Sequence, residues 1–308
     1  MRVSVYLALC GALTLCALLR RVTRSVSPPW AASTLAAGAL LAAVAWVWDL
    51  GLLAGTLIGQ FDIVADVGHW SGPALDRHTP VPDAVAGVAG ALVAVASITL
   101  MACMGRLGRE RRQLRAAIRD CPEATADGLL VIEDPRPRAL AMPQQGRIVI
   151  TTGMVRALSA EERRVVLAHE RAHLRGRHGH YRAAVRLAAA ILPVLRPVVG
   201  DCDYQLERWA DEVAAREVGD RHIAAGALAR AALASRAAGA GASGSRSLAF
   251  SQRGVTSRIR ALLADPPRRH LVRLAGPMLL FAAAAALSIE ASQDLEDLLE
   301  TAQRVWGS

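Results

Sequence analysis

Two histidines and a glutamate lie close together in the segment 166–175, where His169, Glu170 and His173 form the pattern HExxH. A spacing of four residues places both imidazoles on one face of an α-helix, one turn apart, so both can bind the same metal ion. Zinc lowers the pKa of a coordinated water to ~7, and a neighbouring carboxylate such as Glu170 can then take the proton for attack on an amide carbonyl. The apolar residues 165–168 indicate a buried helix, which disfavours the alternative of two surface histidines.

A catalytic zinc ion needs a third protein ligand and an open position. In the metzincin pattern, a third histidine ligand would stand at position 179, which is Gly179 in this chain. For the flanking His178 and His180, we expect a role at a helix end or in supporting a ligand. Glu207 and Asp211 lie one helical turn apart in a later segment, although an exposed acidic helix is the alternative for them. We predict that Glu207 completes a site for one Zn²⁺ per chain, and that Asp211 accepts a hydrogen bond from a ligand imidazole.

The oxyanion that forms during amide hydrolysis needs a positive or hydrogen-bonding partner besides zinc. His222 and Arg258 are the candidates for this stabilising role, with a purely structural role as the alternative for each.

The elements that must position these residues can be read from caps and patterns. Ser159 and Glu162 form a capping box, which predicts the start of the helix that carries HExxH. Asp220 is a second predicted N-cap, and the Gly-, Ala- and Ser-rich residues 237–247 predict a flexible loop. We expect short strands at 129–133, 139–142 and 147–151, the second of them at a sheet edge, and further helices at 203–218 and 255–264.

The composition places much of the chain in lipid. Apolar residues make up 53% of the 308 residues and the mean hydropathy is +0.29, which is rare for a soluble enzyme. The stretch 185–199 is interrupted by two prolines and an arginine, so we expect a buried or membrane-surface helix there. If this stretch crossed the membrane once, the segment with HExxH and the segment with Glu207 would also lie on opposite sides of the membrane. Transmembrane helices are predicted in the apolar stretches 3–19, 30–58, 84–104 and 274–289.

The net charge is +9, and every basic residue is arginine. The arginines gather at the ends of apolar stretches, after the first and the third and before the fourth, whereas the other flanks are acidic. By the positive-inside bias, residues 105–270 are cytoplasmic and both termini lie outside. No motif with interleaved aromatics is present, so direct nucleic-acid binding is not expected.

These patterns predict a mainly α-helical membrane protein, with a helical zincin-type catalytic domain and a small β-sheet. We divide the chain into three transmembrane helices in 1–104, a cytoplasmic zinc peptidase domain in 105–270, and a fourth transmembrane helix with a short external tail in 271–308.

HExxH followed about 35 residues later by ExxAD resembles the integral-membrane zinc peptidases. These include HtpX-type heat-shock peptidases, CAAX prenyl-protein endopeptidases and BlaR/MecR-type antirepressor peptidases. The resemblance covers roughly residues 120–265. It implies that His169, His173 and Glu207 are zinc ligands and that Glu170 is the catalytic base. It also implies that residues 138–143 form the edge strand on which a substrate backbone is laid, and that 257–263 match a late helix containing an arginine.

The sequence departs from HtpX-like patterns at two places. Arg138 stands where an asparagine is usual, and Leu140 stands where an aromatic residue is usual. The His-Pro pair that often precedes the late helix is absent. The arrangement of apolar stretches looks more like the BlaR/MecR-type branch, but a large external sensor domain is missing, so a β-lactam receptor is not expected.

We therefore expect a membrane zinc metalloendopeptidase of the cell membrane, whose substrates are cytoplasmic or membrane-associated polypeptides. By resemblance, a transcriptional repressor or a damaged membrane protein is the kind of target. The alternative is a signal transducer that cleaves itself or a repressor in response to an external stimulus. A zinc-binding scaffold without activity is disfavoured by the intact Glu170.

Overall fold

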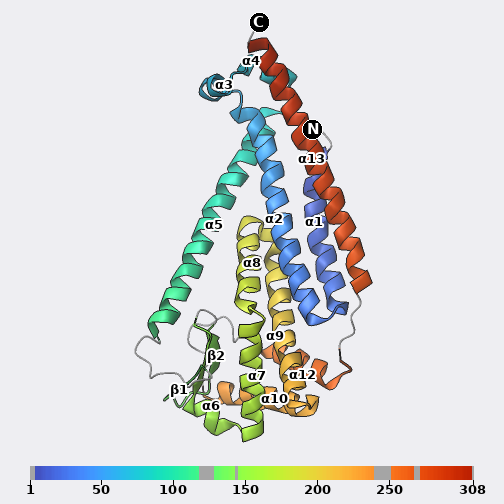
Figure 1. Ribbon diagram of the computed structural model, residues 1–308. Helices are drawn as coiled ribbons and strands as arrows, with labels where there is room; N and C mark the ends of the chain where they lie inside the picture. Colours follow the sequence, from blue (N-terminus) through green and yellow to red (C-terminus); the bar gives the residue numbers. More distant parts are fainter. Residues whose placement is uncertain (1–3, 118–127, 143–144, 239–250, 267–270, 307–308) are drawn as a thin grey trace.

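The computed structural model describes residues 4–117, 128–142, 145–238, 251–266 and 271–306. Four of its helices are long and apolar enough to cross a membrane, and they form the upper part of the molecule in Figure 1. Their outer faces carry exposed apolar side chains such as Val44, Ile98 and Leu279, as expected of surfaces that face lipid. The predicted transmembrane helices and the integral membrane character of the protein are thus confirmed. The helices are α1 (Ser4–Val22), α2 (Pro28–Ile58), α5 (Asp83–Ala117) and α13 (Ala275–Trp306).

Two of these helices are longer than the apolar stretches that predict them. α5 continues past the proposed boundary at residue 104 to Ala117, so this boundary falls inside one helix. α13 continues through the acidic segment after residue 289 to Trp306. In both cases the α-helix continues into polar sequence, because arginine, glutamate and leucine all favour the helical conformation.

Short helices connect the long ones. η1 (Thr23–Ser25) joins α1 to α2, and α3 (Asp62–Gly68) and α4 (Gly72–His78) follow α2 at the end of the bundle that also holds the C-terminus. α4 packs on the last turns of α13 through Leu75 and Ala302.

A small sheet lies at the opposite end of the molecule, near the lower end of α5 (Figure 1). Its order is β1-β3-β2, with β1 parallel and β2 antiparallel to β3. β2 is therefore an edge strand, as predicted. The strands are β1 (Leu129–Ile132), β2 (Ala139–Met142) and β3 (Arg147–Thr151), and α6 (Thr152–Ala157) follows β3 directly.

The helices of the peptidase region begin at their predicted caps. The capping box of Ser159 and Glu162 opens α7 (Ala160–Arg175). The Asp220 carboxylate accepts backbone amide hydrogens at the start of α10 (Arg221–Ala237). α12 (Ser251–Leu263) and η3 (Leu271–Leu274) lead back to α13. The predicted loop 237–247 lies mostly outside the described residues.

The stretch 185–199 forms the tip of a helical hairpin that enters the transmembrane bundle and turns back. The hairpin consists of α8 (His178–Ile191), η2 (Pro193–Leu195) and α9 (Arg196–Val218), and it rises between α2 and α5 in Figure 1. Val185, Leu195 and Val198 are fully buried against alanines and leucines of α1 and α2. The hairpin does not cross, so both ligand segments stay on one side, in agreement with the predicted buried helix.

The start of α9 corrects the sequence-based prediction. α9 begins at Arg196 rather than near residue 203. Pro197 stands in its first turn, where the missing amide hydrogen would have no helical partner in any case. The proline that interrupts the apolar stretch therefore lies in the first turn of a helix.

Candidate metal centre

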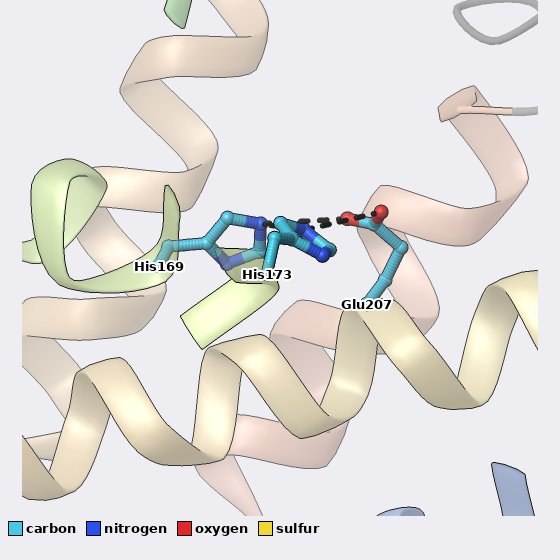
Figure 2. Close-up of side chains that lie close together, drawn as sticks. All are labelled: His169, His173 and Glu207. Atoms are coloured by element: carbon cyan, nitrogen blue, oxygen red, sulfur yellow. Dashed lines mark hydrogen bonds and ion pairs between the residues drawn. The ribbon is translucent and has the colours of Figure 1, made fainter. Parts of the chain in front are cut away.

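The HExxH residues project from the second half of α7 toward α9. His169 and His173 lie one turn apart, and their Nε2 atoms are 3.1 Å from each other. Figure 2 shows both rings turned toward the same point, which Glu207 approaches from the facing helix. α7 is fixed in this orientation by Val165 and Ala168, which are buried against α9, α10 and α12.

Glu207 brings a carboxylate to the two imidazoles from α9. Its Oε2 lies 3.5 Å from His169 Nε2 and its Oε1 lies 3.5 Å from His173 Nε2. One ligand atom from each of the three residues lies within 4.8 Å of the others. Four tetrahedral ligands at a usual zinc distance of ~2.05 Å would stand ~3.3 Å apart. Two imidazole nitrogens and a carboxylate oxygen at these separations fit a catalytic zinc site.

Asp211 lies behind the first histidine. Its Oδ1 is 3.0 Å from His169 Nδ1, so the ring donates its Nδ1 proton to Asp211 and keeps Nε2 free to bind a metal ion. Arg258 of α12 donates two hydrogen bonds of 2.7 Å to the Asp211 carboxylate. The predicted contact between Asp211 and a ligand imidazole is thus present in the structure.

Two arginines also reach Glu207. Arg258 Nη1 is 3.0 Å from one of its oxygens. Arg182 of α8 donates a hydrogen bond to the other oxygen and a second one to Asp203. Arg182 was not singled out from the sequence, because only the turn between α8 and α9 brings it beside Glu207.

The pKa values show how strongly these groups interact. Burial lowers the pKa of His169, but hydrogen bonds to Asp211 and Glu207 outweigh it and raise this pKa to about 10. Burial raises the pKa of Glu207, yet the hydrogen bond to His169 and the charge of Arg258 hold it well below its usual range. Glu207 is therefore an ionised carboxylate, which is the form that binds a divalent cation.

Glu170 faces the sheet. Its Oε2 accepts a hydrogen bond of 2.7 Å from the backbone amide of Ala141 in edge strand β2. Burial raises the pKa of Glu170 above its ordinary value, which makes the carboxylate a better proton acceptor. The predicted base thus lies between the metal-ligand cluster and the strand expected to hold a substrate.

The remaining candidate residues have different positions. His178 is fully buried and contacts His173, whereas His180 is exposed. His222 is exposed in the first turn of α10, and within the described residues no hydrogen bond or ion pair joins it to the cluster. Of the two predicted oxyanion partners, the structure therefore brings Arg258 to the site and leaves His222 outside it.

Comparison with known proteins finds a similarity to one family of peptidases. The model of peptidase family M48 matches residues 109–203, which run from the end of α5 through the sheet and the HExxH helix to the first turns of α9. Residues 109–203 of this chain are thus similar to the peptidases of family M48. The predicted resemblance to integral-membrane zinc metallopeptidases is confirmed at this level, whereas nothing in the match singles out the BlaR/MecR-type branch. The M48 match ends before Glu207, so its place in the cluster rests on the geometry.

One curated relative is a protease HtpX homolog from Caldanaerobacter subterraneus subsp. tengcongensis, which is 34% identical over 71 residues. The aligned segment is 22% of this chain and 24% of that protein, so the chain matches about a quarter of the relative's length. No solved structure matches the chain significantly.

Proposed function

We propose that this protein is a membrane zinc endopeptidase in which His169, His173 and Glu207 hold one Zn²⁺ and Glu170 is the general base. The observation that carries the proposal is the convergence of these three ligands from α7 and α9, with their nearest nitrogen and oxygen atoms 3.1 to 3.5 Å apart. The M48 match supports peptide-bond hydrolysis as the reaction.

A bound zinc ion would polarise the scissile carbonyl and lower the pKa of a water to ~7. Glu170 is the group that takes the proton of the attacking water at its carboxylate and later gives it to the departing amine. Its hydrogen bond from Ala141 fixes the carboxylate at the edge of the sheet. Arg258, 3.0 Å from Glu207, offers the positive charge nearest to where the oxyanion would form.

The outward edge of β2 is suited to bind a substrate backbone. Arg138 bonds to Thr151 of β3. The backbone amides and carbonyls of Ala139 and Ala141 therefore point away from β3, because successive residues of a strand alternate. The Ala141 amide already donates to Glu170, so the other backbone groups of this edge are the ones a substrate would pair with. An extended peptide could add to this edge as a further strand. We infer that substrates are unfolded or extended segments, since a folded helix could not pair there.

The arginine bias favours a cytoplasmic peptidase region, residues 105–270, at the inner membrane face. The hairpin of α8 and α9 ties this region to the transmembrane bundle, so the active site lies close to the bilayer surface. Cytoplasmic or membrane-associated polypeptides are the substrate class that fits this position, and a transcriptional repressor or a damaged membrane protein is a specific form of it.

The decisive experiment compares purified Glu170→Gln, Glu207→Ala and wild-type protein for bound zinc and for cleavage of an unfolded model protein. Glu170→Gln should retain zinc and lose cleavage, because only the proton acceptor is removed. Glu207→Ala should lose both. Glu161→Gln, an exposed carboxylate on the same α7 helix, is the matched control and should behave as wild type. Cleavage by Glu170→Gln at the wild-type rate would show that the mechanism is wrong.

A regulated signal transducer is the second candidate, favoured by one set of contacts. The external α4 packs on α13 through Leu75 and Ala302, and the Ser71 amide donates to the Ala302 carbonyl. At its other end α13 follows α12, whose Arg258 contacts Glu207. A transducer should cleave itself or a repressor only on induction, whereas a constitutive protease should degrade an added substrate without it. Comparing the membrane proteomes of cells with wild-type and Glu170→Gln protein would separate the two.

A further inference from the structure

His178 is the buried histidine for which the proposed mechanism has no use. Its side chain is completely buried and packs on the indole of Trp209, with ring centroids 4.7 Å apart. A fully buried imidazole loses its hydration and needs compensation. The described residues give it one hydrogen bond, between its Nδ1 and His173 Nδ1 at 2.6 Å, and no partner for Nε2.

A hydrogen bond between two Nδ1 atoms allows only two proton arrangements. Either His173 donates and His178 accepts, or the reverse. Nε2 of His173 is the nitrogen that faces His169 and Glu207, so it must be unprotonated to bind a metal ion. A neutral His173 with a free Nε2 carries its proton on Nδ1, and only the first arrangement permits this.

We propose that His178 is a positioning residue for the metal centre, which accepts the Nδ1 proton of His173 and so holds this ligand in the tautomer that binds zinc. The inference rests on the proposed function, since it assumes that His173 is a zinc ligand. His178 would then do for His173 what Asp211 does for His169, with a neutral imidazole in place of a carboxylate.

The local backbone is built to place this ring. His178 lies five residues after His173, and an unbroken helix would put the two on different faces. α7 instead ends at Gly176, and Arg177 takes a left-handed conformation with φ 50° before α8 begins. A side chain at Gly176 would collide with His178, since a Cβ atom there would lie 2.5 Å from its Nε2. A non-glycine residue in the left-handed region, beside a glycine that leaves room for the His178 ring, indicates that this turn is shaped around the buried imidazole.

The orphan Nε2 supports the same conclusion. Whichever nitrogen of His178 carries its proton, Nε2 remains a buried polar atom without a hydrogen bond, at a cost of about 1–3 kcal/mol. A leucine of similar volume would avoid that cost. The group that distinguishes histidine from leucine here is the Nδ1 acceptor, and it points at the metal ligand.

The test measures the zinc dissociation constant of full-length protein in detergent by competition with a chelator. Loss of the hydrogen-bond partner of a metal-binding histidine usually weakens metal binding about 10- to 100-fold. We expect a loss of this size for His178→Leu. His178→Asn places an amide oxygen near the position of Nδ1 and should recover most of the affinity. His180→Leu, at the neighbouring exposed histidine, is the matched control and should bind zinc as wild type.

The absorption spectrum of Co²⁺-substituted protein distinguishes loss of the hydrogen bond to His173 from a defect in packing. The bands should shift in His178→Leu and return toward wild type in His178→Asn. Wild-type affinity in His178→Leu, or equal losses in the leucine and asparagine variants, would overturn the proposal and leave the zinc site intact. Failure of wild-type protein to bind zinc at all would overturn the proposed function as well.

Discussion

Replacing Arg258 by methionine should separate α12 from the metal centre in metal-free protein. Arg258 makes contacts of 2.7, 2.7 and 3.0 Å to the carboxylates of Asp211 and Glu207. Its side chain is only 11% exposed and that of Asp211 only 6%, so water screens these charges little. Methionine keeps much of the length of the side chain and removes the charge, which leaves Asp211 and Glu207, among the described residues, with only their contacts to the two histidines of HExxH and to Arg182.

Removing one partner of a buried ion pair costs about 3–5 kcal/mol. At ~1.4 kcal/mol per factor of ten, this corresponds to a locally open population that is larger by roughly 10²- to 4 × 10³-fold. α12 should stay attached to α10, because Arg221 also donates hydrogen bonds to the carbonyls of Leu262 and Ala261. The fall in stability should therefore appear as local opening rather than as loss of the fold.

Hydrogen exchange followed by mass spectrometry on peptides from α12 measures this opening directly. Arg164→Met is the matched control, because Arg164 makes an exposed 3.9 Å contact to Glu161, and such pairs contribute about 0–1 kcal/mol. Saturating zinc should reduce the effect of Arg258→Met, since the cation compensates Glu207. If α12 exchanged equally slowly in both variants without metal, the buried charge network would not hold this helix, and the reasoning would be refuted.

Three further predictions follow from the same structure. Leu195→Ala at the buried hairpin tip should destabilise the protein by about 2–5 kcal/mol and lower its melting temperature in detergent, while Val194→Ala, at a 51% exposed position, should change little; equal effects would contradict the buried hairpin. Asp211→Leu should weaken zinc binding about 10- to 100-fold in chelator competition, and unchanged affinity would remove its role behind His169. Since the pKa of His169 is raised to about 10 in the metal-free protein, zinc must displace a proton below that pH, and its affinity should fall ~10-fold per unit as the pH is lowered; a flat profile from pH 6 to 9 would contradict this.

Much of the architecture follows from local patterns in the sequence. The four transmembrane helices were predictable because their length and apolarity depend on the bilayer alone. The starts of α7 and α10 were predictable because Ser159 and Asp220 bond to amides within three residues of themselves. The strands 139–142 and 147–151 were predicted with the bounds they have, since short apolar runs between prolines and glycines leave few alternatives.

The local sequence determines one part of the metal centre, and the tertiary structure determines the rest. The spacing of His169 and His173 fixes two ligands on one helix face, because the helical repeat places residues four apart on the same side. The choice of Glu207 from the sequence relied on its spacing to Asp211 and on resemblance to known peptidases. Its distance from the imidazoles is set by the packing of α9 on α7, which no local pattern encodes.

Only the tertiary structure decided three features of this protein. It showed that 185–199 is the tip of a hairpin buried against α1 and α2, with Pro193 in the turn and Pro197 in the first turn of α9. It brought Arg182 and Arg258 to Glu207 from helices distant in sequence, and it left His222 outside. It placed His178 against His173 across a break between two helices. Each of these depends on contacts between segments far apart in the chain, whereas sequence periodicity reports only on neighbours within a few turns.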